Sequence, residues 1–593
     1  MPRGSYEASD KPLSRILRTE QKRYQIPRYQ RNYSWKRSQY ETLWNDLLDE
    51  RKRPVSRGMF LGTILLNLPE TYDHRTEVID GQQRMITLTI LLSSIRDAFN
   101  DLSDFNNASK LQRNYIANSD LGDEEEIPVL ITGAKLQPFF SNYIQHFPRT
   151  DDFTLMQAVS EEEKNVERCR KFFDAQIKKQ LKEVPDHVQR NAWLVSLSKT
   201  ITQVILISIE VEFEEDAYAV FESVNAKGME LTLADLLKNL IFRNLRPNEE
   251  GEDTAQRQWD QIIENLDGTG FPMKKFIRYY WLSKYDFLTE SKLFDAVNQK
   301  LKIEKMQTWQ QFLDDLVNES ARLRRLTHPD SEDYSDLDSP RRISEALQAI
   351  SLMGVSQVYV LLLAISRNLS LKKKWQGDLE FLENFCFRYN VIGKGQAVRV
   401  EKSFSNYARE IEGIRKLEGG ARIKKLNSIL DKLRNEFSQL ARDHVPKELF
   451  VEGFNREIQY STTPKKKNVL GYVLLKLNDH IGGGTGELQV DPRMVNIEHV
   501  LPQKPAQWGL DEKEIEDYVH SIGNLTYLSK KLNSEIGNKP IVEKIVKLKE
   551  SELPMVKKLV KTIEDNQLVW NEKAIDARAN DLAVISFEEV WKI

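Results

Sequence analysis

"EVIDGQQRMITLTILL" (Glu77–Leu92) is the stretch that decides the fold class of the first part of the chain. It begins with an apolar run that ends at Asp80, which is typical of a short strand, and its second half has the apolar pattern of a helix. Gly81 lies between the two and permits a tight turn. A strand that passes directly into a helix predicts an α/β arrangement with polar side chains gathered at the turn.

The polar residues of this turn are suited to binding a phosphate group. Backbone N–H groups and the guanidinium of Arg84 would point to one place. Asp80 could hold a metal ion or a ribose hydroxyl, and the amides of Gln82 and Gln83 can donate or accept hydrogen bonds. The alternative is a plain corner with exposed polar side chains, and the pattern alone favours that alternative.

A second stretch of this part, "IPRYQRNYSW" (Ile26–Trp35), combines aromatic and polar residues. Its aromatic side chains, including Tyr29, could form a packed platform from which Gln30 and Arg31 contact a phosphate or a base. The alternative is a surface aromatic cluster.

A third stretch, "FESVNAKGMELTLADLLKNLIF" (Phe221–Phe242), predicts a turn at Gly228 followed by a helix that carries Lys238 and Asn239. A capped amphipathic helix explains most of these features without any ligand.

Changes in composition divide the chain into three predicted parts, 1–246, 247–445 and 446–593, and favour a mixed, mostly α fold. The first part mixes strand-like runs with helices. Helical periodicity dominates the second, where the acidic stretch His328–Arg342 favours a loop over packed structure. The third opens with a basic helix that contains "KKK" (Lys465–Lys467). This stretch, "SKKL" (Ser529–Leu532) and "RYQIPRYQR" (Arg23–Arg31) are the candidate DNA contacts.

Composition and cysteine content limit the class of protein. The 593-residue chain has a formal net charge of −3, so contacts with DNA must be confined to local basic patches. Its two cysteines, Cys169 and Cys386, match no zinc-ligand spacing and suggest a reducing compartment. The N-terminus lacks the apolar core of a signal peptide, and no apolar run is long enough to span a bilayer. We therefore expect a soluble, cytoplasmic protein without membrane contact.

The third part holds another polar constellation. "NIEHVLPQ" (Asn496–Gln503) predicts a strand that carries Glu498 and His499 and ends before Pro502. The later stretch "LTYLSKKLNSEI" (Leu525–Ile536) predicts a helix.

The residue types of this constellation are those that phosphodiester cleavage needs. A neutral imidazole, here His499, takes a proton from water. The side-chain oxygens of Glu498 and Asn533 could hold a hard divalent cation such as Mg²⁺. Asn524 could fix the imidazole ring. The alternative, which the Glu–His dipeptide alone favours, is a surface pair with helix-capping asparagines.

The ordered set "EHVLPQ … IGNL … LN" resembles the HNH nuclease family, which has the ββα-metal fold. The match is to the variant whose last metal ligand is Asn, a variant that also occurs in the HNH domain of CRISPR effector nucleases. The resemblance implies that His499 is the general base and that Glu498 and Asn533 are metal ligands. It places Asn524 with the catalytic residues, and Asn538 and Lys539 among candidate substrate contacts. Glu498 departs from the Asp of many members.

The three N-terminal stretches, in their order, resemble the N-terminal domain of the GmrSD family, whose hallmark is "DGQQR" (Asp80–Arg84). The resemblance implies a ParB/sulfiredoxin-like core that uses a nucleoside triphosphate, joined to an HNH domain. Members are modification-dependent (type IV) restriction systems that cut phage DNA. The same pairing occurs in phosphorothioate-sensing anti-phage effectors. Met85 stands where Leu is common, and Ala226–Lys227 stands where an Arg often precedes the glycine.

The resemblance also implies a nucleotide site drawn from all three stretches, with Asp80 and Arg84 active in hydrolysis. Its expected residues are Tyr29, Gln30, Arg31, Asp80, Gly81, Gln82, Gln83, Arg84, Lys238 and Asn239.

We therefore expect an NTP-dependent and metal-dependent endonuclease that cleaves modified foreign DNA. The expected cofactors are Mg²⁺ or Mn²⁺ and a nucleoside triphosphate, which can be GTP, ATP, CTP or UTP. The expected partner is modified double-stranded DNA, and a homodimer is left open. The alternatives are a non-cleaving reader of modified DNA, a ParB-like NTP switch, and a phosphorothioate-sensing nicking effector.

Overall fold

Two compact units, Met1–Gly251 and Glu252–Ile593, make up the chain. The computed structural model describes residues 6–17, 23–28, 30–53, 58–68, 75–118, 126–148, 157–212, 233–245, 247, 253–303, 308–483 and 494–593. The predicted boundary at 246/247 lies close to the division between the units. The boundary at 445/446 falls inside the second unit, between α18 (Gly419–His444) and α19 (Lys447–Glu457), and stays a prediction.

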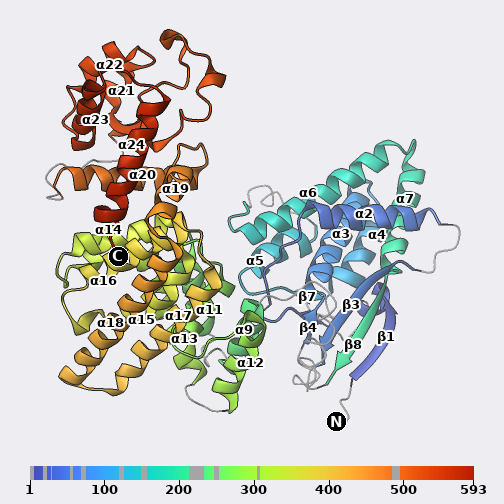
Figure 1. Cartoon of the computed structure of the whole chain (residues 1–593). Helices are drawn as coiled ribbons and strands as arrows, with labels where there is room; N and C mark the ends of the chain where they lie inside the picture. Colours follow the sequence, from blue (N-terminus) through green and yellow to red (C-terminus); the bar gives the residue numbers. More distant parts are fainter. Residues whose placement is uncertain are drawn as a thin grey trace. The chain divides into compact units, whose positions relative to one another are not determined.

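A six-stranded mixed sheet lies in the first unit, with the strand order β1-β8-β3-β4-β2-β7 (Figure 1). β3 pairs in parallel with β8 and antiparallel with β4, and β4 pairs in parallel with β2. A separate pair of short strands, β5 and β6, lies outside this sheet. The strands are β1 (Tyr6–Pro12), β2 (Tyr24–Gln25), β3 (Phe60–Asn67), β4 (Thr76–Asp80), β5 (Ala117–Asn118), β6 (Ile127–Pro128), β7 (Leu130–Ile131) and β8 (Ile205–Val211).

Helices accompany the sheet of the first unit, and α3 packs against α4, α6 and α7. The helices of this unit are α1 (Leu13–Leu17), α2 (Arg37–Arg51), α3 (Gln82–Asp101), α4 (Phe105–Leu111), α5 (Gln137–Phe140), α6 (Glu161–Lys182), α7 (His187–Thr202) and α9 (Leu233–Asn244).

α3 is the helix around which the core of the first unit is built. Its residues from Met85 to Ile95 are all buried, as expected of a helix that is largely apolar on every side. Gly81 caps its N-terminus with φ at 90°. A Cβ atom on Gly81 would lie 2.6 Å from Cγ2 of Ile64, so both the backbone angle and the space require glycine here.

The second unit is almost entirely helical, which together with the mixed sheet of the first confirms the predicted mixed, mostly α fold class. Its longer helices are α10 (Thr254–Leu266), α11 (Met273–Leu282), α12 (Leu293–Asn298), α13 (Trp309–Thr327), α14 (Pro340–Met353), α15 (Tyr359–Ser366), α16 (Gln376–Phe385), α17 (Ala397–Gly413), α18, α19, α20 (Pro464–Ile481), α21 (Lys530–Ile536), α22 (Ile541–Leu548), α23 (Pro554–Asp565) and α24 (Glu572–Ile585).

The acidic stretch His328–Arg342 differs from its prediction. It contains a short 3₁₀ helix (Ser331–Tyr334) whose start is capped by the Asp330 carboxylate. Tyr334 is only 4% exposed, and its hydroxyl donates a hydrogen bond to the carbonyl of Arg325. The expectation of a loop without packed structure is therefore wrong, because one buried aromatic ring anchors a segment that is otherwise charged.

A β-hairpin followed by a helix lies near the C-terminal end of the second unit. β9 (Val495–His499) pairs antiparallel with β10 (Leu525–Ser529), and Glu498 lies opposite Thr526 in this register. α21 begins directly after β10, with the Ser529 hydroxyl capping its N-terminus. The single helix predicted over Leu525–Ile536 is therefore wrong in its first half, because pairing with β9 and burial of every residue from Leu525 to Leu528 override helix propensity there.

In the ranges described, no helix combines the length and the apolar character needed to cross a bilayer.

Candidate functional site

Glu498 is the hub of a buried polar cluster at the end of β9. Its Oε2 accepts a hydrogen bond from Nδ2 of Asn533 at 2.9 Å, and its Oε1 accepts from Nζ of Lys544 at 2.6 Å. The same ammonium donates to the carbonyl oxygen of His499 at 3.0 Å. The structure thus brings together Glu498 and Asn533, the two predicted metal ligands, and adds Lys544, a residue that no motif in the sequence indicated.

Burial acts on both members of the ion pair. It raises the pKa of the Glu498 carboxyl and lowers that of the Lys544 ammonium, while the contact between them works in the opposite direction on each. Oε1 of the carboxylate is thus already in contact with one cationic side chain, Lys544.

A pattern in the sequence could have revealed Lys544. In α22 the inward positions Ile541, Ile545 and Leu548 repeat with helical spacing, and Lys544 falls on the same face. A lysine at a core position is uncommon unless it has an anionic partner.

His499 has different neighbours from Glu498, although the two are adjacent. Its Nε2 lies 3.3 Å from Nδ1 of His520, and its Nδ1 lies 3.3 Å from Nε2 of Gln503. The ring of Tyr460 meets that of His499 edge to face, with centroids 4.6 Å apart. The contacts of the two ring nitrogens of His499, with His520 and with Gln503, are both longer than a typical hydrogen bond. A water molecule can therefore replace either contact with little loss of free energy.

Burial keeps the imidazole of His499 neutral. It lowers the pKa of His499 to about 3, and the nearby His520 and Lys544 add to this effect. A neutral imidazole is the form that accepts a proton from water, so at neutral pH the group is in the protonation state that a general base requires.

Asn524 does not contact the ring of His499, which corrects the expectation that it fixes the imidazole. Its side chain is fully buried and holds the main chain after β9: Oδ1 accepts from the N–H of Leu501, and Nδ2 donates to the carbonyls of Leu501 and Val519, each at 2.8 Å. Nε1 of Trp570 also donates to Oδ1, at 3.1 Å. Asn524 is thus a positioning residue that fixes the turn behind His499.

The residues of this cluster fit a divalent cation that keeps much of its water. Mg²⁺ in proteins is commonly held by one or two carboxylates and several waters, so Glu498 and the amide oxygen of Asn533 suffice as protein ligands. A half-turn of the Asn533 amide would place its oxygen beside the carboxylate. Among the described residues no group of three or more His, Cys, Asp or Glu is arranged to hold a metal ion, so water and substrate oxygens would complete the shell.

In the first unit, the predicted glutamines mainly hold the backbone. Gln83 accepts from the N–H of Ser34 at 2.8 Å and donates to the carbonyl of Asn32 at 3.1 Å. Gln30 donates to the carbonyl of Ile79 at 2.8 Å and accepts from Nε2 of Gln82 at 3.1 Å. These bonds join the loop that follows Ile26 to the turn after β4, so two of the three N-terminal stretches do meet.

Asp80 and Arg84 are the charged groups that remain partly open at this turn. Their side chains are 27% and 23% exposed, and Nη2 of Arg84 lies 3.8 Å from Oδ2 of Asp80. Arg84 also donates to the carbonyl of Thr63 on β3, and burial lowers the pKa of its guanidinium. It therefore supports β3, an inner strand of the sheet, as well as facing the turn, which the sequence did not indicate.

One atom at this turn points to a missing partner. Oε1 of Gln82 is buried and has no hydrogen-bond partner among the described residues. α3 also starts without a side-chain cap, so its first N–H groups are available to an anion. An acceptor without a partner beside uncapped donors fits a ligand that carries both hydroxyl and phosphate groups, as a nucleotide does.

The other residues predicted to bind the nucleotide have no described hydrogen bond to the turn at Gly81. Arg31 is exposed, and Asn239 on α9 is buried at 3% exposure. Nζ of Lys238 lies 5.3 Å from the ring centre of Phe242. Tyr29 and the stretch from Phe221 to Thr232 lie outside the described residues.

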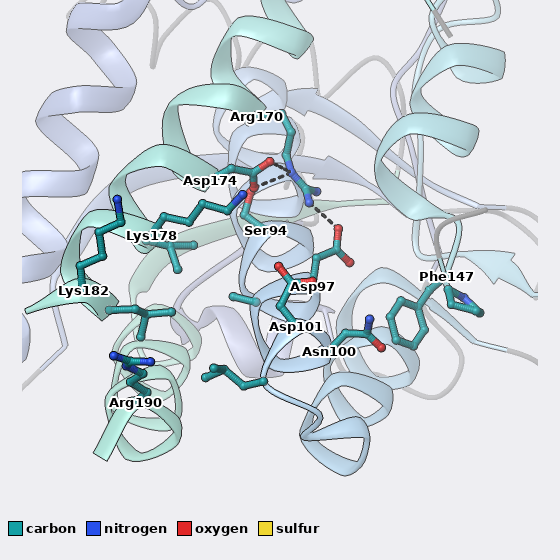
Figure 2. Close-up of a pocket in the computed structure, with 15 residues that line it drawn as sticks. Ser94, Asp97, Asn100, Asp101, Phe147, Arg170, Asp174, Lys178, Lys182 and Arg190 are labelled. Atoms are coloured by element: carbon teal, nitrogen blue, oxygen red, sulfur yellow. Dashed lines mark hydrogen bonds and ion pairs between the residues drawn. The ribbon is translucent and has the colours of Figure 1, made fainter. Parts of the chain in front are cut away.

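A cavity of about 420 Å³ lies elsewhere in the first unit, among α3, α6 and α7 (Figure 2). Arg170 is buried in its wall and donates to the carboxylates of Asp97 and Asp174. Lys182 and Arg190 stand at the opposite side in Figure 2. None of the predicted nucleotide-binding residues lines this cavity, so it is separate from the turn at Gly81.

Two family models match the sequence. The model described as "GmrSD restriction endonuclease, N-terminal domain" matches residues 13–242, and the model described as "GmrSD restriction endonucleases, C-terminal domain" matches residues 449–585. The first range contains the turn at Gly81 and the second contains the Glu498 cluster. No curated protein matches the chain.

Asn524→Ala tests the positioning role. The change leaves the N–H of Leu501, two carbonyls and the indole N–H of Trp570 without their partner, and we expect a loss of about 2–4 kcal/mol in the free energy of unfolding. Urea unfolding followed by tryptophan fluorescence measures this loss. Asn538→Ala, at an exposed position, should change stability by no more than about 0.5 kcal/mol. Unchanged stability in Asn524→Ala together with an inactive enzyme would return Asn524 to a direct catalytic role.

Proposed function

The chain belongs to the GmrSD family of restriction endonucleases, and we propose that it cleaves modified DNA in a reaction that requires a divalent metal ion and a nucleoside triphosphate. Its membership makes it a DNA endonuclease. The metal requirement, the nucleotide requirement and the modification are the parts that we propose.

One observation carries the assignment of the cleavage site: a neutral imidazole, His499, adjoins a carboxylate, Glu498, that is in contact with Asn533. This combination brings a proton acceptor on β9 together with oxygen ligands from β9 and α21.

We propose the following roles for these residues. If the Gln503 amide is turned so that its oxygen accepts a hydrogen bond from Nδ1 of His499, Nε2 carries the lone pair, and a water that replaces its 3.3 Å contact with His520 would give up a proton to it. Glu498 and Asn533 would hold the metal ion, which when bound supplies positive charge to the phosphate as negative charge develops there. Lys544 keeps the Glu498 carboxylate in place and adds a fixed positive charge. Asn524 holds the turn that aims the imidazole.

The turn at Gly81 is the proposed nucleotide site. Its support is the Asp80–Arg84 pair, the uncapped start of α3 and the buried oxygen of Gln82. Arg84 would bind a phosphate, and Asp80 would accept a hydrogen bond from a ribose hydroxyl or hold the metal ion of the nucleotide.

Two other functions would use the same surfaces. A reader of modified DNA that does not cleave would bind DNA without product, and a ParB-like switch would turn over nucleotide without cutting. The contact between Glu498 and Asn533 beside a neutral His499 favours cleavage over both.

His499→Ala should abolish most of the DNA cleavage and leave DNA binding intact. A positioned general base contributes about 10²–10⁴-fold to the rate, so we expect a fall of at least that size in single-turnover cleavage of modified plasmid or phage DNA. His328→Ala, which changes an exposed histidine of the same unit, is the matched control and should cleave normally. Full cleavage by His499→Ala would rule out this site.

Asn533→Ala should change the metal dependence instead. With one oxygen ligand removed, the Mg²⁺ concentration that gives half-maximal cleavage should rise about tenfold or more, and high Mg²⁺ or Mn²⁺ should partly restore the rate. The same metal titration should not rescue His499→Ala. An unchanged Mg²⁺ requirement in Asn533→Ala would exclude this residue as a ligand.

Asp80→Asn tests the nucleotide site, because it removes the charge and keeps the shape of the side chain. Phosphate release is measured with GTP, ATP, CTP and UTP in turn. For the nucleotide that the parent protein hydrolyses, we expect the rate to fall about tenfold or more, with a melting temperature within a few degrees of the parent. Asp49→Asn, on the exposed face of α2, should hydrolyse normally. Normal hydrolysis by Asp80→Asn combined with reduced hydrolysis by Lys182→Ala would move the nucleotide to the cavity of Figure 2.

A further inference from the structure

A groove of about 900 Å³ in the second unit runs between α14, α20 and the β9–β10 hairpin, and we refer to it as the α14–α20 groove. Asn533 and Tyr460 line one part of it. Asn533 contacts Glu498 and Tyr460 contacts His499, so the groove reaches the proposed cleavage site. Its other wall, α14, belongs to a helical region to which the sequence assigned no DNA contact.

Basic side chains outnumber acidic ones in the α14–α20 groove, and most of the acidic ones are already neutralised. Glu345 pairs with both Arg341 and Arg342, and Asp479 pairs with Arg342. The charged residues of its lining are Arg341, Arg342, Lys467, Lys476 and Lys530 on the basic side and Glu345, Glu383 and Asp479 on the acidic side.

Glu383 and Lys476 are committed to each other at the floor of the groove. Glu383 is 1% exposed and accepts hydrogen bonds from Nζ of Lys476 and from the hydroxyl of Tyr472. The indole N–H of Trp591 donates in turn to that hydroxyl at 2.7 Å. This network fixes the floor, so the groove is formed before any ligand arrives.

Lys467 and Lys530 are the basic residues of the groove that remain available. Both are exposed, and neither has an ion-pair partner in the parts of the chain that the structure describes. They come from opposite sides, Lys467 from α20 and Lys530 from the start of α21. Two unpaired ammonium groups facing one groove attract a ligand with repeated negative charge.

The start of α20 carries an electrostatic cost that an anion would remove. Lys465, Lys466 and Lys467 lie in its first turn, which contains no acidic residue, and the Thr463 side chain does not cap the helix. The N-terminus of a helix is already positive, so three lysines there oppose the helix dipole. A phosphate bound at this place would offset that repulsion.

We propose that the α14–α20 groove binds the phosphate backbone of the DNA strand that enters the proposed cleavage site at Asn533. α14 supplies one wall through Arg341, whose solvent-exposed ion pair with Glu345 a phosphate can replace. The proposal rests on the proposed endonuclease function. The groove recognises phosphates, so binding through it is insensitive to base sequence. A modification of a base is therefore read elsewhere.

Fluorescence anisotropy with the full-length chain and a labelled DNA duplex tests the groove, in Ca²⁺ to prevent cleavage and over a series of salt concentrations. Lys467→Ala/Lys530→Ala should weaken binding about tenfold or more at moderate salt and lower the slope of log K against log salt by about 2, because each lysine neutralises one phosphate. Arg341→Ala should lower the slope by about 1. Lys424→Ala/Lys425→Ala, which removes two exposed lysines of α18 outside the groove, should leave the slope unchanged.

Cleavage kinetics separate the groove from the catalytic site. The Lys467→Ala/Lys530→Ala variant should need more DNA for half-maximal cleavage and reach a maximal rate within about threefold of the parent, whereas His499→Ala should bind DNA with the parent's salt slope and fail to cut. Unchanged affinity and slope in the double lysine variant would overturn the groove proposal, and an unchanged slope in Arg341→Ala would overturn the assignment of α14. Cleavage by His499→Ala would overturn the proposed function and leave the binding result standing.

Discussion

The hydrogen bonds of one buried amide, Asn524, are the constraint on which the proposed cleavage site depends. They fix the N–H and the carbonyl of Leu501, so the chain must turn directly after His499. Asn524 also immediately precedes β10, whose pairing with β9 sets Glu498 opposite Thr526. The helix that follows β10 then brings Asn533 onto the carboxylate. The residue that orders the site therefore touches neither the imidazole nor the carboxylate.

The first unit uses buried amides in the same way. Gln30 and Gln83 direct their hydrogen bonds to the main chain of the neighbouring segment, and Gly81 allows β4 and α3 to meet there. Among the described residues of this turn, the partly exposed side chains of Asp80 and Arg84 and the unpartnered oxygen of Gln82 remain for a ligand. In both units, most residues of the polar motif hold the backbone in place, and few are left to bind a ligand. The hydrogen-bond partners of each side chain show which of the two roles it has.

Much of this architecture could be predicted from the sequence, and each prediction that the structure contradicts is wrong for a physical reason. The strand and helix on either side of Gly81 follow from local periodicity, as does the strand that ends at His499. The helix predicted over "LTYL" is wrong because the pairing partner of this strand lies 26 residues away (525 − 499) and has no local signal. The contact between Glu498 and Lys544 joins residues 46 positions apart. The only signal for it in the sequence is the position of Lys544 on the apolar face of α22. The roles of Asn524 and Arg84 depend on main-chain carbonyls and N–H groups, which carry no sequence signature.

The buried ammonium of Lys544 gives the cleavage site its own counterion. A carboxylate that is already neutralised attracts a free divalent cation less strongly than a bare one does. A DNA phosphate at the site would restore the missing negative charge, so metal and substrate would assemble together rather than in sequence. Under the metal requirement proposed above, the protein would then hold no metal ion at this place between encounters with DNA. For a nuclease, such an order of assembly would keep the hydrolytic machinery incomplete until a substrate is in place.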